Sequence, residues 1–111
     1  MTGRDPGPAD ALVITDNAGE RRYEAHLDGR LAGFVEYGRV PNRIVALHTE
    51  VPREFGGRGI ASALVQRVLA DARAAGVKVT PRCPFFIAHF ERHPEDRDLL
   101  AHPWRPPGKG G

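Results

Sequence analysis

The chain has 111 residues, of which 41% are hydrophobic and 27% are charged, and its formal net charge is +2 with a pI of about 9.1. This composition is that of one globular domain with a hydrophobic core, and no apolar run approaches the roughly 20 residues that a membrane-spanning helix requires. The first residues lack the apolar segment of a secretory signal, and a single cysteine, Cys83, excludes an internal disulfide and a multi-cysteine zinc site. We therefore expect a cytoplasmic protein with no membrane partner.

The predicted elements lie between residues 11 and 100, which we expect to form a single domain. The two ends, residues 1–10 and 103–111, are rich in Pro and Gly and poor in core-forming residues, so we predict that they are flexible tails. Trp104 is the one tail residue that we expect to dock against the domain. The residues that carry chemistry are therefore sought between these tails.

Four strands are predicted in the first half of the chain. Tyr23 and its alternate neighbours are apolar while the residues between them are charged, which is the period of a half-buried strand. Asp28 and Gly29 follow, a dipeptide that favours a tight hairpin turn because both positions need positive φ. A loop is expected at residues 39–43. The predicted strands cover residues 11–17, 21–27, 30–38 and 44–51.

One long helix and two shorter elements are predicted in the second half. Pro52 ends the fourth strand, and apolar residues recur at three- and four-residue spacing over residues 60–75, which predicts an amphipathic helix closed by Gly76. A fifth strand is expected at residues 77–81 and a short helix at residues 85–92. The element order is therefore ββββαβα, an α/β protein of the α+β type.

The glycines before the long helix indicate a phosphate site, because a helix N-terminus presents free N–H groups and the positive end of its dipole. A P-loop is excluded, since no lysine lies between Met1 and Val77. A dinucleotide fingerprint would need a third Gly or Ala where this chain has Ser62, and an acidic residue where it has Thr80 and Pro81.

The stretch "EFGGRGIASALV" instead resembles the loop that binds the coenzyme A pyrophosphate in the GNAT superfamily of N-acetyltransferases. Gly57 and Gly59 match the Gly-x-Gly core of that motif, whereas Glu54 stands where the family has Gln or Arg. The segments "HTEVP" and "PRCPFFIAHFERHPE" extend the resemblance to about residues 11–100 and to a short, Yjdj-type branch. The resemblance implies a minimal GNAT-like fold whose mixed, mainly antiparallel sheet has about five strands.

The resemblance also implies acetyl transfer from the cosubstrate acetyl-CoA to an amine, either a protein or peptide lysine or a small amine. Arginines that flank the loop could pair with phosphates or remain solvated, and a main-chain N–H near the end of the fourth strand would serve the oxyanion. The residues expected to bind the coenzyme are Val51, Arg53, Gly56, Gly57, Arg58, Gly59, Ile60 and Ala61.

Three residues are candidates for the chemistry of transfer. His48 and Glu50 are two positions apart on one strand and therefore share a face, so either could act as the base for the amine or be a solvated strand end. Cys83, where the resemblance implies the active site, could protonate the departing thiolate, accept the acetyl group, or be a buried apolar thiol. The tyrosine that many GNAT enzymes use for the leaving group has no counterpart, since Tyr23 and Tyr37 lie on early strands.

Other functions are compatible with some of these features. A CoA-binding or acyl-CoA-binding module without turnover is the main alternative, because the tyrosine position is vacant and Glu54 departs from the motif. His89 and His93 are four apart, but no dense cluster of ligands accompanies them, so we expect no metal. The basic residues are scattered, so we expect no nucleic-acid partner, and a monomer or weak homodimer.

Overall fold

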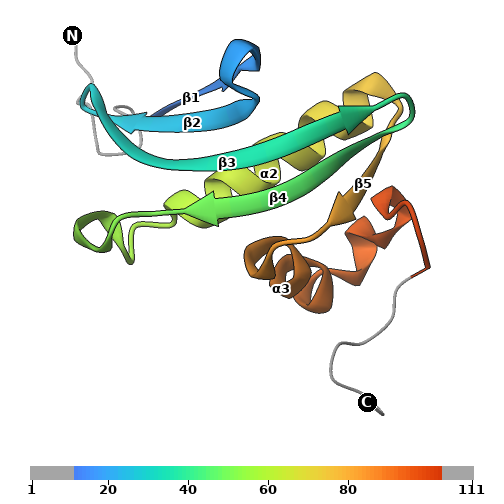
Figure 1. Cartoon of the computed structure of the whole chain (residues 1–111). Helices are drawn as coiled ribbons and strands as arrows, with labels where there is room; N and C mark the ends of the chain where they lie inside the picture. Colours follow the sequence, from blue (N-terminus) through green and yellow to red (C-terminus); the bar gives the residue numbers. More distant parts are fainter. Residues whose placement is uncertain (1–11, 104–111) are drawn as a thin grey trace, which may run out of the picture.

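The computed structural model describes residues 12–103 and contains a single sheet with the strand order β1-β2-β3-β4-β5 (Figure 1). Its helices and strands follow one another as ββββαβα, which confirms the predicted order, with 3₁₀ turns after β1, after β4 and after the last helix. The expected docking of Trp104 lies outside the described residues, as do both predicted tails except Pro103. The elements are β1 (Leu12–Asn17), β2 (Arg22–Leu27), β3 (Arg30–Val40), β4 (Arg43–Glu50), α2 (Ile60–Ala75), β5 (Lys78–Pro81) and α3 (Pro84–Arg92).

Strands β1 to β4 form antiparallel pairs, and β5 adds to β4 in parallel, so the sheet is mixed and mainly antiparallel as predicted. Strand β2 has one buried face, as its alternating sequence predicted: Tyr23 and Ala25 are fully buried, while Arg22, Glu24 and His26 are half-buried. Asp28 and Gly29 have φ values of 53° and 80°, the positive values that a two-residue hairpin turn of type I′ requires.

The connection between β3 and β4 is shorter than the predicted loop of residues 39–43. Strand β3 continues to Val40 and pairs it with Arg43, which leaves only Pro41 and Asn42 in the turn. The restricted φ of proline favours the second position of a tight turn, and Val40 has a β-branched side chain that suits an extended backbone. The polar and proline-containing stretch of residues 39–43 therefore predicted too long a loop, because the strands extend into it from both sides.

Helix α2 covers one face of the sheet and packs against α3, and the buried residues form one core (Figure 1). The opposite face of β1 to β4 carries no helix in residues 12–103, and Val13, Leu31 and Leu47 are among its exposed side chains. The core is built mainly from apolar residues of the strands and of α2, among them Tyr23, Val35, Ile44, Leu64, Val68, Val79, Phe86 and Phe90.

Polar contacts fix α2 to the first strands. The Tyr23 hydroxyl donates to Asp71 at 2.8 Å, and burial together with this carboxylate raises the pKa of Tyr23. Arg67 binds the same carboxylate and also donates to the main-chain oxygen of Ile14 at 2.8 Å. Helix α2 is thus held at a fixed height over β1 and β2, which fixes the position of its N-terminus as well.

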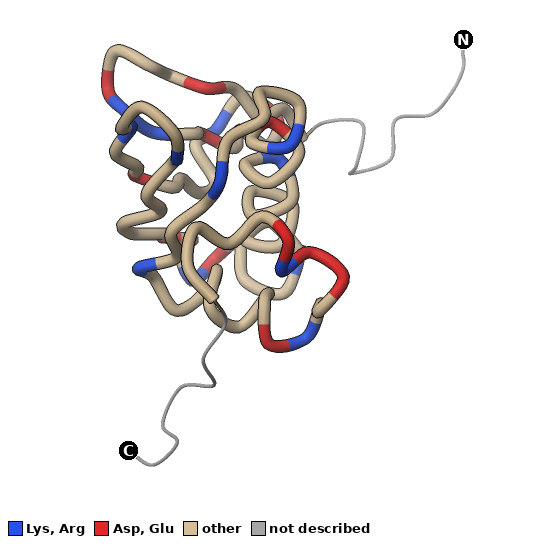
Figure 2. The backbone as a smooth tube through the Cα atoms, turned by 90° about the vertical axis from the view of Figure 1, so that its right-hand side faces the viewer, with Lys and Arg blue, Asp and Glu red and all other residues tan. Residues whose placement is uncertain are grey.

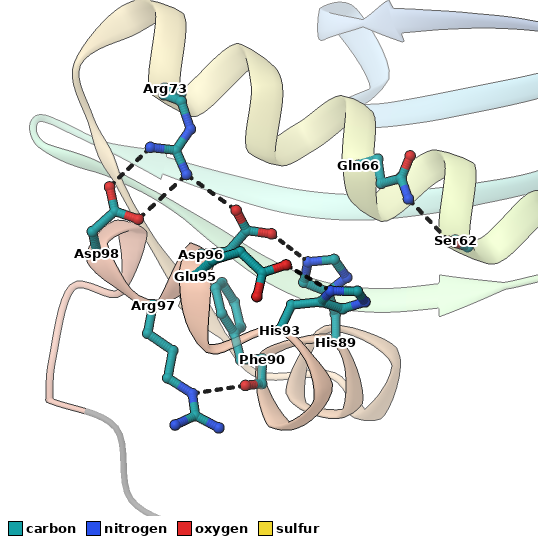
Figure 3. Close-up of polar contacts among 10 residues, drawn as sticks. All are labelled: Ser62, Gln66, Arg73, His89, Phe90, His93, Glu95, Asp96, Arg97 and Asp98. Atoms are coloured by element: carbon teal, nitrogen blue, oxygen red, sulfur yellow. Dashed lines mark hydrogen bonds and ion pairs between the residues drawn. The ribbon is translucent and has the colours of Figure 1, made fainter.

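A 3₁₀ turn that follows α3, Pro94–Leu99, binds both α3 and α2 through its side chains (Figure 3). Arg73 of α2 donates to Asp98 at 2.9 Å and to Asp96 at 3.2 Å, and His89 of α3 lies 2.8 Å from Asp96. The hydrogen bond from Arg73, together with its charge, lowers the pKa of Asp98 because both favour the ionised carboxylate. This network joins α2, α3 and the 3₁₀ turn around one arginine.

None of the helices in residues 12–103 combines the length and the apolar character needed to cross a bilayer. Figure 2 shows Lys and Arg interspersed with Asp and Glu along the backbone, with no single basic stretch.

Candidate functional site

Strands β4 and β5 are paired over only four positions, from Arg43 with Lys78 to Ala46 with Pro81. Arg82 still donates its main-chain N–H to the Ala46 oxygen at 2.9 Å, after which the chain turns into α3. Strand β4 continues to Glu50, and the two ribbons separate there (Figure 1). The last residues of β4 are therefore paired with β3 on one side and have no strand partner on the other.

A bulge at Leu47 changes which side chains of β4 face the helices. Tyr37 pairs with Ala46 whereas Glu36 pairs with His48, so Leu47 has no partner of its own on β3. Both Leu47 and His48 are exposed in consequence, and the next residue, Thr49, is buried. The bulge thus directs His48 and Glu50 to the open face and Thr49 to the face that α2 covers.

His48 and Glu50 lie together on the open face, with Nε2 of the histidine 3.5 Å from Oε1 of the glutamate. Both side chains are more than half exposed. The ring of Phe34 lies 6.2 Å from the His48 ring, centroid to centroid, and the guanidinium carbon of Arg22 lies 4.9 Å from the centroid of the same phenyl ring. An imidazole beside a carboxylate, both open to solvent, is a pair of residue types that enzymes use as general bases.

Cys83 lies on the other side of β4. It directly precedes α3, its side chain is 2% exposed, and its Sγ is 3.1 Å from the Thr49 hydroxyl oxygen. The structure therefore brings Cys83 to Thr49 and not to His48 or Glu50, which occupy the opposite face of the strand. The contact with Thr49 joins residues 34 positions apart, and no local pattern in the sequence indicates it.

The glycine-rich loop leaves β4 through Pro52 and a 3₁₀ turn, Arg53–Phe55, whose Phe55 is buried in the core. Gly57 and Gly59 have φ values of 77° and 75°, in the left-handed region that glycine adopts most easily. A Cβ built on either residue would meet no heavy atom within 4 Å. The backbone of this loop therefore borders open space that a ligand can enter.

The N-terminus of α2 has no side-chain cap. Gly59 is its N-cap and offers no side chain, and the first turn contains no acidic residue. The first N–H groups of this 16-residue helix thus face the loop without a protein acceptor from a capping side chain. The exposed Arg53 and Arg58 make no ion pair within the described part of the chain, whereas Ile60 is buried and Val51 and Ala61 are half-buried. An anion would find both partial and formal positive charge here.

Two residues of the site carry no obvious signal in the sequence. A Cβ on Gly33 of β3 would lie 3.1 Å from the Glu50 oxygen and 3.2 Å from the Ile60 side chain, so glycine permits β3 to approach the loop ends. Arg30, the first residue of β3, forms an ion pair of 2.6 Å with Glu54 of the loop. A glycine inside a strand often marks such a close approach, and that is the one local signal available.

Other features lie away from this loop. The His89 and His93 rings stack with centroids 4.4 Å apart, and each ring binds a carboxylate. Residues 12–103 contain no group of three or more side chains placed to hold a metal ion. A hollow of about 470 Å³ beside α2 and one of about 360 Å³ near Tyr37 are both lined by residues outside the loop. The open loop, with its exposed backbone donors, has the better chemistry for a ligand.

Comparisons with known proteins agree with this arrangement. The family model for GCN5-related N-acetyl-transferase matches residues 22–99. None of the curated proteins matches the chain. A GCN5-like protein from Staphylococcus aureus, solved by NMR, has a similar structure, with a TM-score of 0.66 and 23% identity over 91% of this chain and 98% of that one.

Two larger enzymes share the fold at lower coverage. A ribosomal-protein-alanine N-acetyltransferase from Brucella melitensis has a TM-score of 0.54 and 24% identity over 76% of this chain and 64% of that one. The ribosomal-protein-S18-alanine N-acetyltransferase from Escherichia coli has a TM-score of 0.53 and 20% identity over 57% of this chain and 43% of that one. At these identities the likeness concerns the fold. The match of the family model over most of the chain decides the family, and the chain belongs to the GCN5-related N-acetyltransferases.

Proposed function

We propose that residues 11–100 form an acetyl-CoA-binding domain that transfers the acetyl group to an amine. The observation that carries this proposal is the N-terminus of α2, which has no side-chain cap and whose glycine loop borders open space at the end of β4 that β5 does not pair. Acetyl-CoA, when bound, would supply an acetyl group activated as a thioester. A loop of glycines with positive φ beside open space fits a pyrophosphate, which needs close contact with backbone N–H groups.

The coenzyme would be held mainly by the backbone of the loop. The first N–H groups of α2 would donate to phosphate oxygens, and the two exposed arginines would add charge-assisted contacts. The main-chain N–H groups at the end of β4 would stabilise the oxyanion, because that strand edge is not covered by β5. The proposed coenzyme residues are Val51, Arg53, Gly56, Gly57, Arg58, Gly59, Ile60 and Ala61.

The two faces of β4 would carry out two different proton transfers, one from the attacking amine and one to the departing sulfur. On the open face His48, or Glu50 beside it, would accept the proton that the amine loses as its nitrogen forms a bond with the acetyl carbon. On the helix side Cys83 would donate a proton to the sulfur that departs when the thioester bond breaks, or would itself accept the acetyl group. The proximity of Thr49 to Cys83 supports this division, since a hydroxyl at 3.1 Å can exchange a hydrogen bond with the thiol.

The acceptor amine would approach from the open face of the sheet. No helix covers this face in residues 12–103, so a bulky acceptor has room beside His48. Such an opening suits the lysine of a protein or peptide, a polyamine, or a site that a partner subunit completes. Activity measured with a panel of different amines would identify the acceptor.

A CoA-binding module without turnover is the second candidate, and the tyrosines favour it. Tyr23 and Tyr37 donate their hydroxyl groups to Asp71 and Asp16, and their rings lie 5.3 Å apart at a tilt of 54°, far along the chain from Cys83. Neither tyrosine is available as an acid for a leaving thiolate, and the one thiol of the site is almost fully buried. In this reading the loop binds the coenzyme and no acetyl group is transferred.

Calorimetric titration with CoA and acetyl-CoA tests the proposed site, and release of free CoA with a panel of amines tests turnover. We expect binding of both coenzymes, and release that depends on a lysine peptide or a polyamine. A His48→Gln variant should keep the affinity for CoA and lose much of the amine-dependent release, about 10²-fold or more for a general base. Tight CoA binding without release would favour the non-catalytic module, and absence of binding would overturn the site itself.

A further inference from the structure

Glu54 is an unexpected charge in a loop that is proposed to bind an anion. It lies in the 3₁₀ turn of the loop next to Arg53 and is 61% exposed. A carboxylate so close to an incoming pyrophosphate would repel it through solvent, since the Debye length at physiological ionic strength is about 8 Å. Some other group must offset this charge if the loop is to bind phosphate well.

Arg30 is placed to offset it. This residue begins β3, and its Nη2 atom lies 2.6 Å from Oε2 of Glu54. Its guanidinium carbon also lies 5.0 Å from the centroid of the Phe55 ring, the one residue of the 3₁₀ turn that is buried. One side chain therefore contacts two successive residues of the loop, one through charge and one through stacking.

The path of β3 brings Arg30 to the loop. Because β3 and β4 are antiparallel, the start of β3 lies beside the end of β4, where the loop begins, and Phe34 pairs with Glu50. Gly33 lets β3 approach to within van der Waals contact of Val51 and Ile60. The hairpin between β2 and β3 is thereby attached to the loop by close packing and by a side-chain contact.

The ion pair itself contributes little to overall stability, because both side chains are about two-thirds exposed and exposed pairs are weak. Its effect is local instead. The guanidinium offsets the carboxylate charge in the loop that leads to α2, and its contact with Phe55 restricts the 3₁₀ turn that precedes the glycines.

We infer that Arg30 is a positioning residue for the coenzyme loop, which neutralises Glu54 and holds the turn Arg53–Phe55 in the conformation that receives the pyrophosphate. This inference rests on the proposed binding of CoA at the loop. It assigns to the β2–β3 hairpin a part in coenzyme affinity, although no residue of that hairpin belongs to the glycine motif.

The affinity for CoA of a set of variants at positions 30 and 54 tests the inference. Arg30→Ala should raise the Kd for CoA about fivefold at low salt, the size expected for one charge-assisted contact. Arg30→Lys should restore part of this loss, since it returns the charge without the planar stacking group. Glu54→Gln combined with Arg30→Ala should relieve most of this loss, because no carboxylate then remains to be neutralised, while the smaller part that depends on the contact with Phe55 should persist. The difference between wild type and Arg30→Ala should shrink near 1 M salt, where the Debye length is about 3 Å.

Arg39→Ala is the matched control. Arg39 lies on the same strand, forms an ion pair of 3.7 Å with Asp16, and stacks over Tyr37 at 5.4 Å, but at the end of β3 that is remote from the loop. Its replacement removes the same kind of side chain and should leave the Kd for CoA unchanged. A loss of affinity equal to that of Arg30→Ala would show a general effect of surface charge and would overturn the inference.

Hydrogen exchange without coenzyme supplies a second measurement that does not depend on CoA binding. The amides of Phe55 and Gly56 donate to Pro52 and Arg53 at 2.8 and 3.0 Å, so opening of the turn exposes them. We expect about threefold or faster exchange at these amides in Arg30→Ala and no change in Arg39→Ala. Unchanged exchange together with an unchanged Kd would overturn the inference, as would a loss of affinity that Glu54→Gln fails to relieve. Wild-type protein that binds no CoA would instead refute the proposed function, while the exchange measurement would still decide whether Arg30 holds the loop.

Discussion

Thr49 and Cys83 show how a single bulge determines the environment of a residue. Without the extra residue Leu47, the alternation of β4 would place position 49 on the open face and position 48 among the helices. With it, a threonine hydroxyl meets the only thiol of the chain inside the core, and a histidine is left in solvent. The two proposed chemical groups are separated because β4 is irregular at one position.

The thiol of Cys83 should be protected in the folded protein. Because its side chain is 2% exposed, a water-soluble disulfide reagent should react roughly tenfold or more slowly with native protein than with urea-unfolded protein. Absorbance of the released chromophore measures the rate. Thr49→Ala opens the space beside Sγ and should speed the reaction, whereas Thr15→Ala, an exposed threonine on β1, serves as the control. A native thiol that reacts as fast as the unfolded one would contradict the buried position.

Helix α2 begins and ends with a glycine of left-handed conformation. Gly59 at the N-cap has a φ of 75° and Gly76 at the C-cap has a φ of 71°, and a Cβ on either would meet no atom within 4 Å. The two residues therefore carry the same conformational requirement in similar space. They differ in surroundings, because the Gly76 N–H is bound by the last turn of the helix while Gly59 lies at free N–H groups.

Because Gly59 and Gly76 have the same conformation, substituting each one in turn separates an effect on stability from an effect on coenzyme binding. Gly59→Ala and Gly76→Ala should each lower the free energy of unfolding by about 1 kcal/mol, the cost of a left-handed alanine. Only Gly59→Ala should weaken CoA binding, by about tenfold or more, because its methyl group occupies the space proposed for the pyrophosphate. Urea unfolding and calorimetry measure the two quantities. Equal affinities in the two variants would argue against a backbone cradle at the loop.

At the scale of elements, the sequence predicted what local patterns determine. Alternation located β2, the three- and four-residue spacing located α2, and Asp28 with Gly29 located a turn that has the expected positive φ values. The glycine loop was also found, since Gly57 and Gly59 are adjacent in the sequence to the helix they serve.

The remaining features of the site could not be predicted because they depend on contacts between distant residues. The Arg30 and Glu54 pair joins positions 24 apart, and the Gly33 contact depends on how closely two strands and a helix approach. The bulge at Leu47 is visible only when both strands are aligned, since "IVALHTE" reads locally as one regular strand. The pairing of His48 with Glu50 was anticipated, but the face on which they lie was not.

For the whole molecule, the balance of charge predicts a decline of stability in acid. The ion pair with Arg22 lowers the pKa of Glu24, and the contact with Arg73 lowers the pKa of Asp98. A carboxyl group whose pKa is lower in the folded state stabilises the fold above the ordinary pKa, which is 4.5 for Glu24 and 3.8 for Asp98, and this contribution is lost as the pH falls further.

Urea unfolding as a function of pH tests this prediction. The free energy of unfolding should change little between pH 7 and about pH 5 on account of these carboxyl groups, and should fall progressively below about pH 4.5. Asp98→Asn should be less stable than the wild type at neutral pH and should approach it in strong acid, where the wild-type carboxyl is also uncharged. A constant difference between the two proteins over the whole range would show that Asp98 acts through packing rather than through charge.

The short parallel pairing of β4 with β5 also has a consequence for the order of folding. Strands β1 to β4 follow one another through short connections, so their contacts close small loops, whereas β5 reaches β4 only after α2 has formed and crossed the sheet. Closure of the larger loop carries the greater entropic cost and is expected late in folding. The proposed coenzyme opening would therefore be completed last and lost first, and a bound coenzyme would act on the rate of unfolding more than on the rate at which the antiparallel strands assemble.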